Sequence, residues 1–480
     1  MDAVVIRRPS GGSRFSRLPS GNRRSRIDAA KSAATRERAY MSLRTRVSAT
    51  LLAGALASVG LGAIPAQADT SRGITIPAFY TPPANLPAAN GGLIRTEPLQ
   101  LALNLPGINS SMPGSATRIM YKSTGSTGSP VAVTGAYLEP AAPWLGMGPR
   151  PLVVLAPGTM GQGDQCSTSL ALQRGLILGI GKEQSTVSVG YEILAMYRLL
   201  AKGIAVVQTD YVGLGTTDRL HTYVNRIDSG HAVLDAARAA KALPNTKVTA
   251  QAPVGLYGYS QGGGAVASAA ELQATYAPDV ALKATYAGAP PANLVDVTAA
   301  IDGSELLGAL GWSVNGFLQA KPEIRPLFDR YLSDNGRAAL QDMSTMCVGD
   351  AIITYAGTRS STWTTNGESV AEIIGAEPVL RVFINDQLLG TRKPTGIVRV
   401  ATGVNDNLVP HAQARTMAVD WCGLGGKVVY DPINLPKGSS ALLNHFGPLL
   451  TDQSTAVDWL THRLAGWPAV SNCPILPLLP

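Results

Sequence analysis

The sequence predicts an α/β protein with a mostly parallel central sheet, flanked by helices and interrupted by a helical insertion. Between residues 151 and 288, short apolar segments alternate with helical patterns, as expected for βα units on a parallel sheet. From about residue 292 to 392 only amphipathic helical patterns follow, and this stretch is too long for a single connection. A glycine-rich turn around Ser260, between a predicted strand and a predicted helix, is the third observation.

The first half of the chain contains most of the predicted strands. Residues 69–113 are rich in proline, and we expect an irregular arm over the surface. An antiparallel pair at 117–121 and 131–137 follows, joined by a Gly/Ser/Thr turn. The alternating elements after it are the strand 151–156, the helix 189–201, the strand 204–209, the helix 230–243, the strand 254–257, a helix after Ser260 and the strand 281–286.

The second half begins with the insertion and then returns to the sheet. The sheet is expected to resume with a strand at 397–403, a helix around 417–421, a strand at 427–430 and a closing helix at 455–464. Apolar residues of the insertion belong mostly to its core, and some could line an acyl pocket. They are Leu306, Leu307, Leu310, Trp312, Phe317 and Leu318.

The predicted domain organisation has five segments. These are a basic leader or a mis-assigned start at 1–40, a signal peptide at 41–68, the first part of the core at 69–291, a helical cap at 292–392 and the second part of the core at 393–480.

The basic charge of the chain is confined to its N-terminal segment. Residues 1–68 carry 12 of the 40 Lys and Arg residues but only 3 of the 32 acids, a net charge of +9. The other 412 residues hold 28 basic and 29 acidic groups, a net charge of −1. The body therefore gives no reason to expect a nucleic-acid partner.

The segment from Met41 has the features of a secretory signal peptide. A short basic region precedes the apolar run 48–65 and the small-residue site Ala66-Gln67-Ala68. The alternative is a membrane anchor, but the run is short for a span and ends at a cleavage-type site. We expect a secreted protein, either released or associated with the cell envelope.

Four cysteines follow the predicted signal peptide. They are Cys166, Cys347, Cys422 and Cys473, and none forms a C-x-x-C pair, so no metal site is expected. An even number in an exported protein predicts two disulfides, with three possible connectivities.

The turn at residues 258–262 has the G-x-S-x-G pattern of a nucleophile elbow. A serine on a sharp strand-to-helix turn projects its hydroxyl above the sheet, and Gly258 and Gly262 leave room for that turn. The N–H of Gln261, at the start of the helix, points to where an oxyanion would form. The alternative is a plain glycine-rich turn, but the flanking strand and helix favour a catalytic Ser260.

A serine nucleophile requires a base, and His445 is the best candidate. It follows the last predicted strand and precedes the predicted closing helix, in the Ser, acid, His order of such folds. His411 is the competitor, because it opens a helix directly after the expected acid loop. The other histidines, which we expect to be structural or solvated, are His221, His231 and His462.

The orienting acid is expected to be Asp406, at the end of an apolar strand. Its alternative role is an N-cap for a helix at Val409, and both roles are compatible. Asp386, Asp420 and Asp431 are weaker candidates.

A second oxyanion donor is expected in the loop after the strand 151–156, at Gly158 or Thr159. Asp210, after the strand 204–209, could be a structural hinge or line the site.

Together these motifs resemble the secretory lipase family of fungal lipase A type, which has bacterial members. The resemblance covers roughly residues 90–470 and rests on G-Y-S-Q-G-G, the helix before it, T-D-Y-V-G-L-G, D-x-x-V-P and the segment 421–428. It implies a capped α/β hydrolase that acts on acylglycerols and other carboxylic esters without a cofactor. It also implies disulfides Cys166–Cys347 and Cys422–Cys473. Some family members carry an acidic side chain in the oxyanion loop, where this chain has Gly158 and Thr159.

The sequence thus predicts a secreted ester hydrolase with an ester or lipid substrate, possible contact with a lipid interface, and no obligate protein partner. An acyltransferase would use the same residues, with an alcohol or sugar in place of water. A non-catalytic binding protein would usually lack a triad member, and a cutinase-like enzyme would not need so long a chain. The apolar tail, residues 475–480, could pack on the body or meet lipid.

Overall fold

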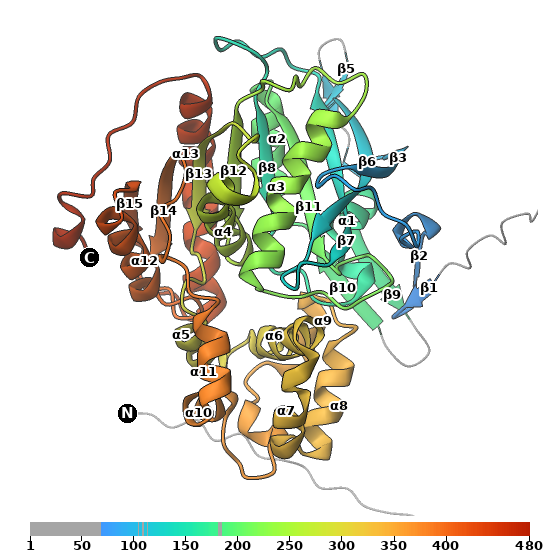
Figure 1. Cartoon of the computed structure of the whole chain (residues 1–480), viewed down its shortest axis with the longest axis vertical. Coiled ribbons are helices and arrows are strands. Elements are labelled where there is room, and N and C mark those ends of the chain that lie inside the picture. Colours follow the sequence, from blue (N-terminus) through green and yellow to red (C-terminus); the bar gives the residue numbers. More distant parts are fainter. Residues whose placement is uncertain (1–68, 104, 108–109, 113, 181–184) are drawn as a thin grey trace, which may run out of the picture. The chain divides into compact units, whose positions relative to one another are not determined.

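The computed structural model describes residues 69–480, except 104, 108–109, 113 and 181–184 (Figure 1). The expected leader at 1–40 and signal peptide at 41–68 lie outside the described residues. A nine-stranded sheet with the order β15-β14-β13-β12-β8-β11-β7-β6-β3 forms the centre of the fold. The strands are β3 (Leu93–Pro98), β6 (Gly114–Thr124), β7 (Pro130–Pro140), β8 (Leu152–Ala156), β11 (Ala205–Val212), β12 (Val254–Tyr259), β13 (Leu282–Gly288), β14 (Ile397–Gly403) and β15 (Lys427–Ile433).

The sheet combines a parallel and an antiparallel part. From β15 to β11 each neighbouring pair is parallel, and from β11 through β7 and β6 to β3 each pair is antiparallel. The parallel strands β8, β12 and β14 are buried on both faces, which explains their largely apolar runs in the sequence. This architecture is the predicted α/β-hydrolase fold.

Helices cover both faces of the sheet (Figure 1). On one face α3 (Arg226–Ala242), α4 (Gln261–Tyr276) and α12 (His411–Gly423) pack over Val154. On the other face α2 (Ile193–Ala201) and α13 (Ala441–Leu464) pack over Val153 and Leu155. Adjacent residues of one strand therefore contribute to different core clusters, as the twofold alternation of side chains along a strand requires.

The N-terminal region differs from the irregular arm expected for residues 69–113. It contains β1 (Asp69–Ser71) paired with β2 (Ile74–Ile76), β3 at the sheet edge, and β4 (Leu105–Gly107) paired with β5 (Ser110–Met112). The sequence of β3, L-I-R-T-E-P, lacks an apolar run because an edge strand is only partly buried.

Three predicted helices have different limits in the structure, and the helix expected at 230–243 spans Arg226–Ala242. The helix expected at 189–201 begins at Ile193, because β10 (Ser185–Val189) pairs with β9 (Leu176–Ile180) in a hairpin. The helix expected at 455–464 begins earlier, at Ala441, and includes Pro448. The apolar tail packs on the body through the buried Leu476, while Leu478 stays exposed.

Between β13 and β14 the chain forms only helices, gathered beyond one end of the sheet (Figure 1). They have a hydrophobic core of their own, which includes Leu307, Trp312 and Leu318. The exact limits of the predicted domains remain a prediction. The helices are α5 (Leu294–Ile301), α6 (Leu307–Ala320), α7 (Arg325–Tyr331), α8 (Asp334–Met343), α9 (Val348–Tyr355), α10 (Val370–Ala376) and α11 (Pro378–Asn385).

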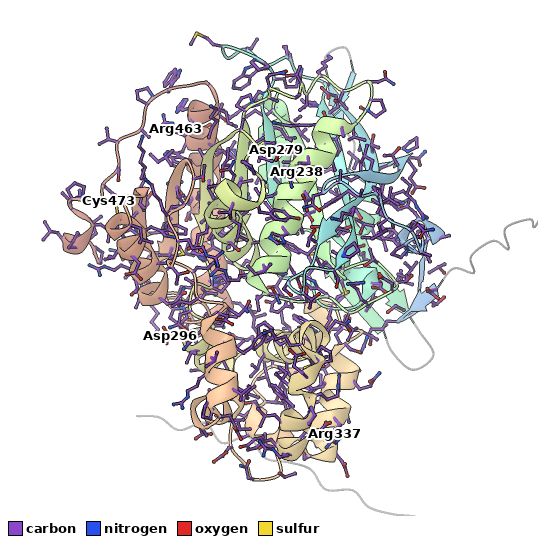
Figure 2. The ribbon with its side chains drawn as sticks, in the orientation of Figure 1. Arg238, Asp279, Asp296, Arg337, Arg463 and Cys473 are labelled. Carbon is purple, nitrogen blue, oxygen red and sulfur yellow. A yellow bond between two sulfur atoms is a disulfide. The ribbon has the colours of Figure 1, made fainter. Side chains whose placement is uncertain are left out.

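Two disulfides link distant parts of the chain, in the pairing that the resemblance implied. Cys166 and Cys347 join the loop after β8 to the N-cap position of α9, with an S–S distance of 2.11 Å. Cys422 and Cys473 join α12 to the C-terminal segment, with an S–S distance of 1.94 Å (Figure 2). The first disulfide thus connects the core to the helical insertion.

Two negative findings apply to the described part of the chain. None of its helices is long and apolar enough to cross a membrane. Its His, Cys, Asp and Glu side chains also form no group of three or more that could hold a metal ion.

The two disulfides should contribute unequally to stability. They close segments of 181 and 51 residues. From the entropy that each link removes from the unfolded chain, we expect stabilisations of ~5 and ~4 kcal/mol, respectively. We expect Cys166→Ala/Cys347→Ala to lower the free energy of unfolding in urea by about 1 kcal/mol more than Cys422→Ala/Cys473→Ala. A larger loss in the second double variant would show that the shorter link matters more.

Candidate active site

Ser260 occupies a strained turn between β12 and α4. Its backbone has φ 57° and ψ −125°, a conformation that a residue with a side chain rarely adopts. The Ser260 N–H donates to the carbonyl of Gly288 at 2.9 Å, which anchors the turn to the neighbouring strand β13. Such strain persists only where surrounding contacts hold it, and it is typical of functional sites.

The two flanking glycines are sterically required. A Cβ on Gly258 would lie 2.1 Å from the carbonyl oxygen of Gly262. A Cβ on Gly262 would lie 2.1 Å from the carbonyl oxygen of Ala156 at the end of β8. Any side chain at either position would therefore collide with backbone, as the sequence pattern predicted.

Asp406 and His445 are in direct contact. The Asp406 carboxylate accepts a hydrogen bond from His445 Nδ1 at 2.6 Å, and both side chains are buried. The other Asp406 oxygen accepts from the N–H groups of Leu408 and Val409, each at 3.0 Å. These bonds fix the carboxylate so that it orients the imidazole.

The alternative role of Asp406 as the N-cap of a helix at Val409 is not what the structure shows. Helix α12 begins at His411, and its N-cap is Pro410. Asp406 instead holds the turn before the helix. His445 also differs from expectation, because it lies inside α13 rather than in a loop before it.

Tyr259 brings the His445 segment to the nucleophile turn. The hydroxyl of Tyr259, the residue before Ser260, donates to the His445 carbonyl at 2.6 Å, and the two rings lie 5.4 Å apart. His445 Nε2 is buried and has no hydrogen-bond partner among the described residues. The structure shows no hydrogen bond from Ser260 to this nitrogen, and such catalytic bonds often tighten only when substrate is bound.

Gln261 is held by His221, which the sequence gave no reason to place near Ser260. The Gln261 side-chain amide donates to His221 Nε2 at 2.9 Å, and His221 Nδ1–H donates to the Val212 carbonyl at 2.9 Å. Burial lowers the pKa of His221 to about 4, so the ring is neutral and can accept this bond. His221 precedes Gln261 by 40 residues, and a lone histidine in a loop carries no signal of such a role.

The loop after β8 is anchored by its neighbours. The Gly158 N–H donates to the Glu192 carboxyl at 2.5 Å, and the Tyr211 hydroxyl donates to the Pro157 carbonyl at 2.6 Å. The Thr159 and Tyr223 hydroxyls are hydrogen-bonded at 2.6 Å. Burial raises the pKa of Glu192 to about 7.

Two other residues that the sequence suggested for the site, His411 and Asp210, form hydrogen bonds that hold the fold together. His411 Nε2 is hydrogen-bonded to the Tyr430 hydroxyl at 2.8 Å. Asp210 is fully buried and accepts from Thr134, Thr168 and Ser169, which ties β11 to β7 and to α1 (Thr168–Arg174). Asp210 is therefore a structural residue.

A small apolar cavity adjoins Ser260, with about 40 Å³ of free space. Ser260, Gln261 and Thr159 form its polar end, whereas Gly158 does not border it. Of the apolar insertion residues named above, Leu306 and Phe317 line this cavity and Leu310 lines the next one. The remaining walls are Tyr223, Val224, Pro291, Leu294, Val297, Thr298, Ile301, Ala309, Ser313, Ile384, Leu408 and Val409.

Comparison with known proteins identifies relatives that match most of the chain. A family model described as secretory lipase matches residues 178–472. A probable inactive lipase of Mycobacterium tuberculosis is 28% identical over 399 residues, covering 82% of this chain and 83% of the relative. Lipase 10 of Candida albicans is 26% identical over 419 residues, covering 84% of each.

Solved structures share the fold. The closed state of Candida antarctica lipase A has a TM-score of 0.68 and 18% identity, over 82% of this chain and 87% of that chain. A rice cell wall degrading esterase of Xanthomonas oryzae has a TM-score of 0.62 and 19% identity, and the match covers 77% of this chain and 97% of that chain.

Glu192 should make stability depend on pH. Because folding raises its pKa from 4.5 to about 7, the native state keeps a proton that the unfolded chain has released between these values. The contribution of Glu192 to the free energy of unfolding is therefore greatest below pH 4.5. It is lost as the pH rises through 7, and the loss is on the order of 3 kcal/mol. Glu192→Gln keeps an acceptor for Gly158 and should flatten this fall in urea unfolding.

Asp164 provides the matched control for that experiment. Burial also raises its pKa to about 7, but Asp164 lies in the short 3-10 helix Asp164–Cys166, and Gly158 donates its N–H to Glu192 rather than to Asp164. Asp164→Asn should flatten the pH dependence similarly, and the double variant should add the two effects. A Glu192→Gln variant with the wild-type slope would contradict the role of this carboxyl.

Proposed function

The chain belongs to the secretory lipase family, and from this membership we propose that it cleaves carboxylic esters through a covalent acyl-enzyme on Ser260. The observation that carries the proposal is the buried Asp406–His445 pair, tied by Tyr259 to the strained turn of Ser260. Membership of the family and lipase relatives support an ester hydrolase. The serine mechanism is our assignment.

In the proposed reaction, Ser260 Oγ attacks the ester carbonyl carbon while His445 Nε2 takes the hydroxyl proton. Asp406 holds the Nδ1–H tautomer and stabilises the imidazolium that forms. The C–O bond to the alcohol then breaks, and the imidazolium returns its proton to the leaving oxygen. Water, activated by the same nitrogen, attacks the acyl-enzyme and releases the acid and free Ser260.

We assign the oxyanion donors to the N–H groups of Gln261 and Thr159. The Gln261 N–H begins helix α4 and is not used by the helix. Of the two expected loop donors, Gly158 already donates to Glu192, whereas Thr159 borders the cavity beside Ser260. Removing one such donor typically costs about 100- to 1,000-fold in rate.

The acyl group is proposed to enter the helical insertion. The cavity at Ser260 shares Thr298, Ser313, Phe317 and Ile384 with a second apolar cavity. That cavity shares further walls with a third one, next to Trp363. Their free volumes of about 40, 30 and 20 Å³ are small, so a long acyl chain requires side-chain movement along this path.

One relative is described as a probable inactive lipase, so the chain's own residues must decide whether it is active. The strained turn of Ser260, the Asp406–His445 hydrogen bond and the cavity at Ser260 support the proposal that this chain is active. We also propose that the protein is exported, since the family is a secretory one and both cysteine pairs form disulfides.

The triad assignment can be tested on p-nitrophenyl esters from acetate to palmitate. Residues 69–480 are suitable, since they contain the whole described sheet and both disulfides. Ser260→Ala and His445→Ala should each lower kcat by about 10⁴- to 10⁶-fold, because the nucleophile and its base act as a unit. His411→Ala is the control and should stay within a few-fold of wild type. Activity retained in folded Ser260→Ala would refute the mechanism.

The acyl path can be tested by blocking it. Ser313 lies between the first two cavities, so Ser313→Phe should lower kcat/KM for palmitate at least about tenfold and leave acetate within about threefold. Gln319→Phe, on an exposed position of the same helix, is the matched control and should change neither. Equal loss on both esters would place the acyl chain elsewhere.

A further inference from the structure

A wide groove lies at the amino-terminal ends of the parallel strands, whereas Ser260 lies at their carboxyl-terminal ends. It encloses about 780 Å³ and runs beside the amino-terminal ends of β13, β14 and β15. Ser260 follows the carboxyl end of β12, which is parallel to these strands. The groove is therefore separate from the proposed catalytic centre.

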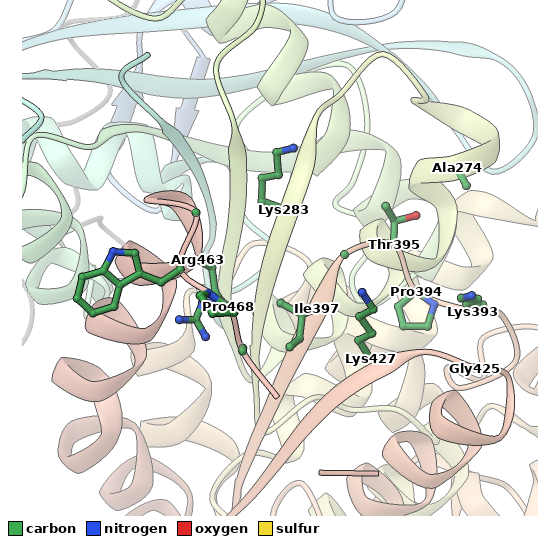
Figure 3. A pocket seen from close by; sticks show the side chains of 14 residues that line it. Ala274, Lys283, Lys393, Pro394, Thr395, Ile397, Gly425, Lys427, Arg463 and Pro468 are labelled. Atoms are coloured by element: carbon green, nitrogen blue, oxygen red, sulfur yellow. The ribbon is translucent and has the colours of Figure 1, made fainter. Parts of the chain in front are cut away.

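The groove is lined by cations and by no acid. Lys283, Lys393, Lys427 and Arg463 come from four different segments of the chain around it (Figure 3). None of the four forms an ion pair with a described residue, whereas most other arginines of the core are paired. The body as a whole is almost neutral, so this concentration of positive charge is local.

Arg463 is the only arginine among the four cations of the groove and is partly buried. It lies near the end of α13 (Figure 2), and its Nε atom is buried without a hydrogen-bond partner among the described residues. The guanidinium also lies over the Trp459 ring, at 5.9 Å from its centroid, which fixes its position.

Trp467 adds a flat aromatic surface to the groove. It is 60% exposed, although such a large side chain is usually buried. One contact of its ring is a parallel stack on His462, with centroids 4.5 Å apart. An exposed aromatic ring beside cations suits a ligand that carries both apolar ring faces and negative charges.

We propose that this groove binds a polyanionic saccharide, a sugar chain that carries carboxylate, sulfate or phosphate groups. Its size exceeds that of one anion, and its four cations suit several negative charges along a chain. Trp467 would stack on the C–H face of a sugar ring. A bilayer is a poorer fit, because a groove is concave and because docking here would hold Ser260 on the side away from the lipid.

The proposal does not depend on the ester hydrolase function. A saccharide bound in this groove leaves the carboxyl ends of the parallel strands uncovered, so Ser260 stays accessible to substrate. The groove would thus retain the protein on an anionic matrix.

The test measures binding of a heparin oligosaccharide to residues 69–480 by calorimetry at several salt concentrations. This form lacks the basic residues of 1–68, which would bind heparin by themselves. We expect binding that weakens with salt, and no binding of neutral dextran. Lys283→Glu/Lys427→Glu should lower the affinity at least about tenfold at 0.15 M salt.

The matched control has the same change of net charge. Arg325→Glu/Arg381→Glu alters two exposed arginines on α7 and α11 of the insertion and should change the affinity less than about threefold. Trp467→Ala should weaken binding of heparin while its salt dependence stays the same. Hydrolysis of p-nitrophenyl butyrate should be unchanged in the groove variants, which separates this proposal from the proposed function.

Three outcomes would overturn the proposal. The first is an equal loss of affinity in the groove double variant and in the control double variant, which would mean that heparin is attracted only by the net charge of the protein. The second is unchanged binding in Trp467→Ala, which would mean simple anion binding without a sugar contact. The third is binding of anionic phospholipid vesicles through Lys283 and Lys427 in the absence of heparin binding, which would assign the groove to a membrane.

Discussion

The strained backbone of Ser260 is the constraint on which the rest of the structure depends. A residue with φ 57° keeps that conformation only if both of its neighbouring elements are fixed. Here β12 is held between β8 and β13, and α4 packs so closely that a Cβ on Gly263 would lie 2.1 Å from the Gly288 carbonyl oxygen. The alanine-rich helix is therefore a requirement of the turn. Only small side chains allow α4 to approach the sheet closely enough to hold Ser260 in place.

The same helix also positions the insertion relative to the nucleophile. Glu271, eleven residues after Ser260, is buried and accepts from Arg226 at 2.6 Å, from Trp421 at 2.8 Å and from the Gly390 N–H at 2.7 Å. One carboxylate thus joins α3, α4, α12 and the segment that leaves the insertion. Because the desolvation of a buried ion pair offsets much of its attraction, its main effect is to specify one arrangement of these elements. Together with the Cys166–Cys347 disulfide, it attaches the insertion to the core at both sides of the catalytic loops.

The sequence predicted the elements whose local pattern is determined by burial or by a sharp turn. Continuous apolar runs located the parallel strands, and 397–403 agrees with β14 residue for residue. It did not predict β3, whose half-buried edge position requires no apolar pattern, nor the early start of α13, where Pro448 gives the appearance of a loop. In the site, the spacing of G-x-S-x-G and the order of strands are the basis for proposing Ser260, Asp406 and His445, and the structure brings Asp406 and His445 into contact. The contacts of His221 and Glu192 arise only when loops distant in sequence meet, and no short motif encodes them.

In a parallel sheet, the amino ends of the strands lie on one side and the carboxyl ends on the other, so the two sides can have different functions. The strands of this sheet are five to eight residues long in its parallel part, so their ends lie roughly 17 to 26 Å apart. At about 20 Å and an effective dielectric constant of about 20, one cation at the amino ends interacts with a charge at Asp406 or His445 by only about 1 kcal/mol, and the solvent around the exposed lysines weakens this further. The groove can therefore carry unpaired positive charge without disturbing the acid–base pair. Conversely, the residues of the groove impose no condition on the turn of Ser260, because β13 to β15 contact α4 and α12 through apolar side chains. This separation is why binding and hydrolysis are expected to respond independently to substitutions at each edge.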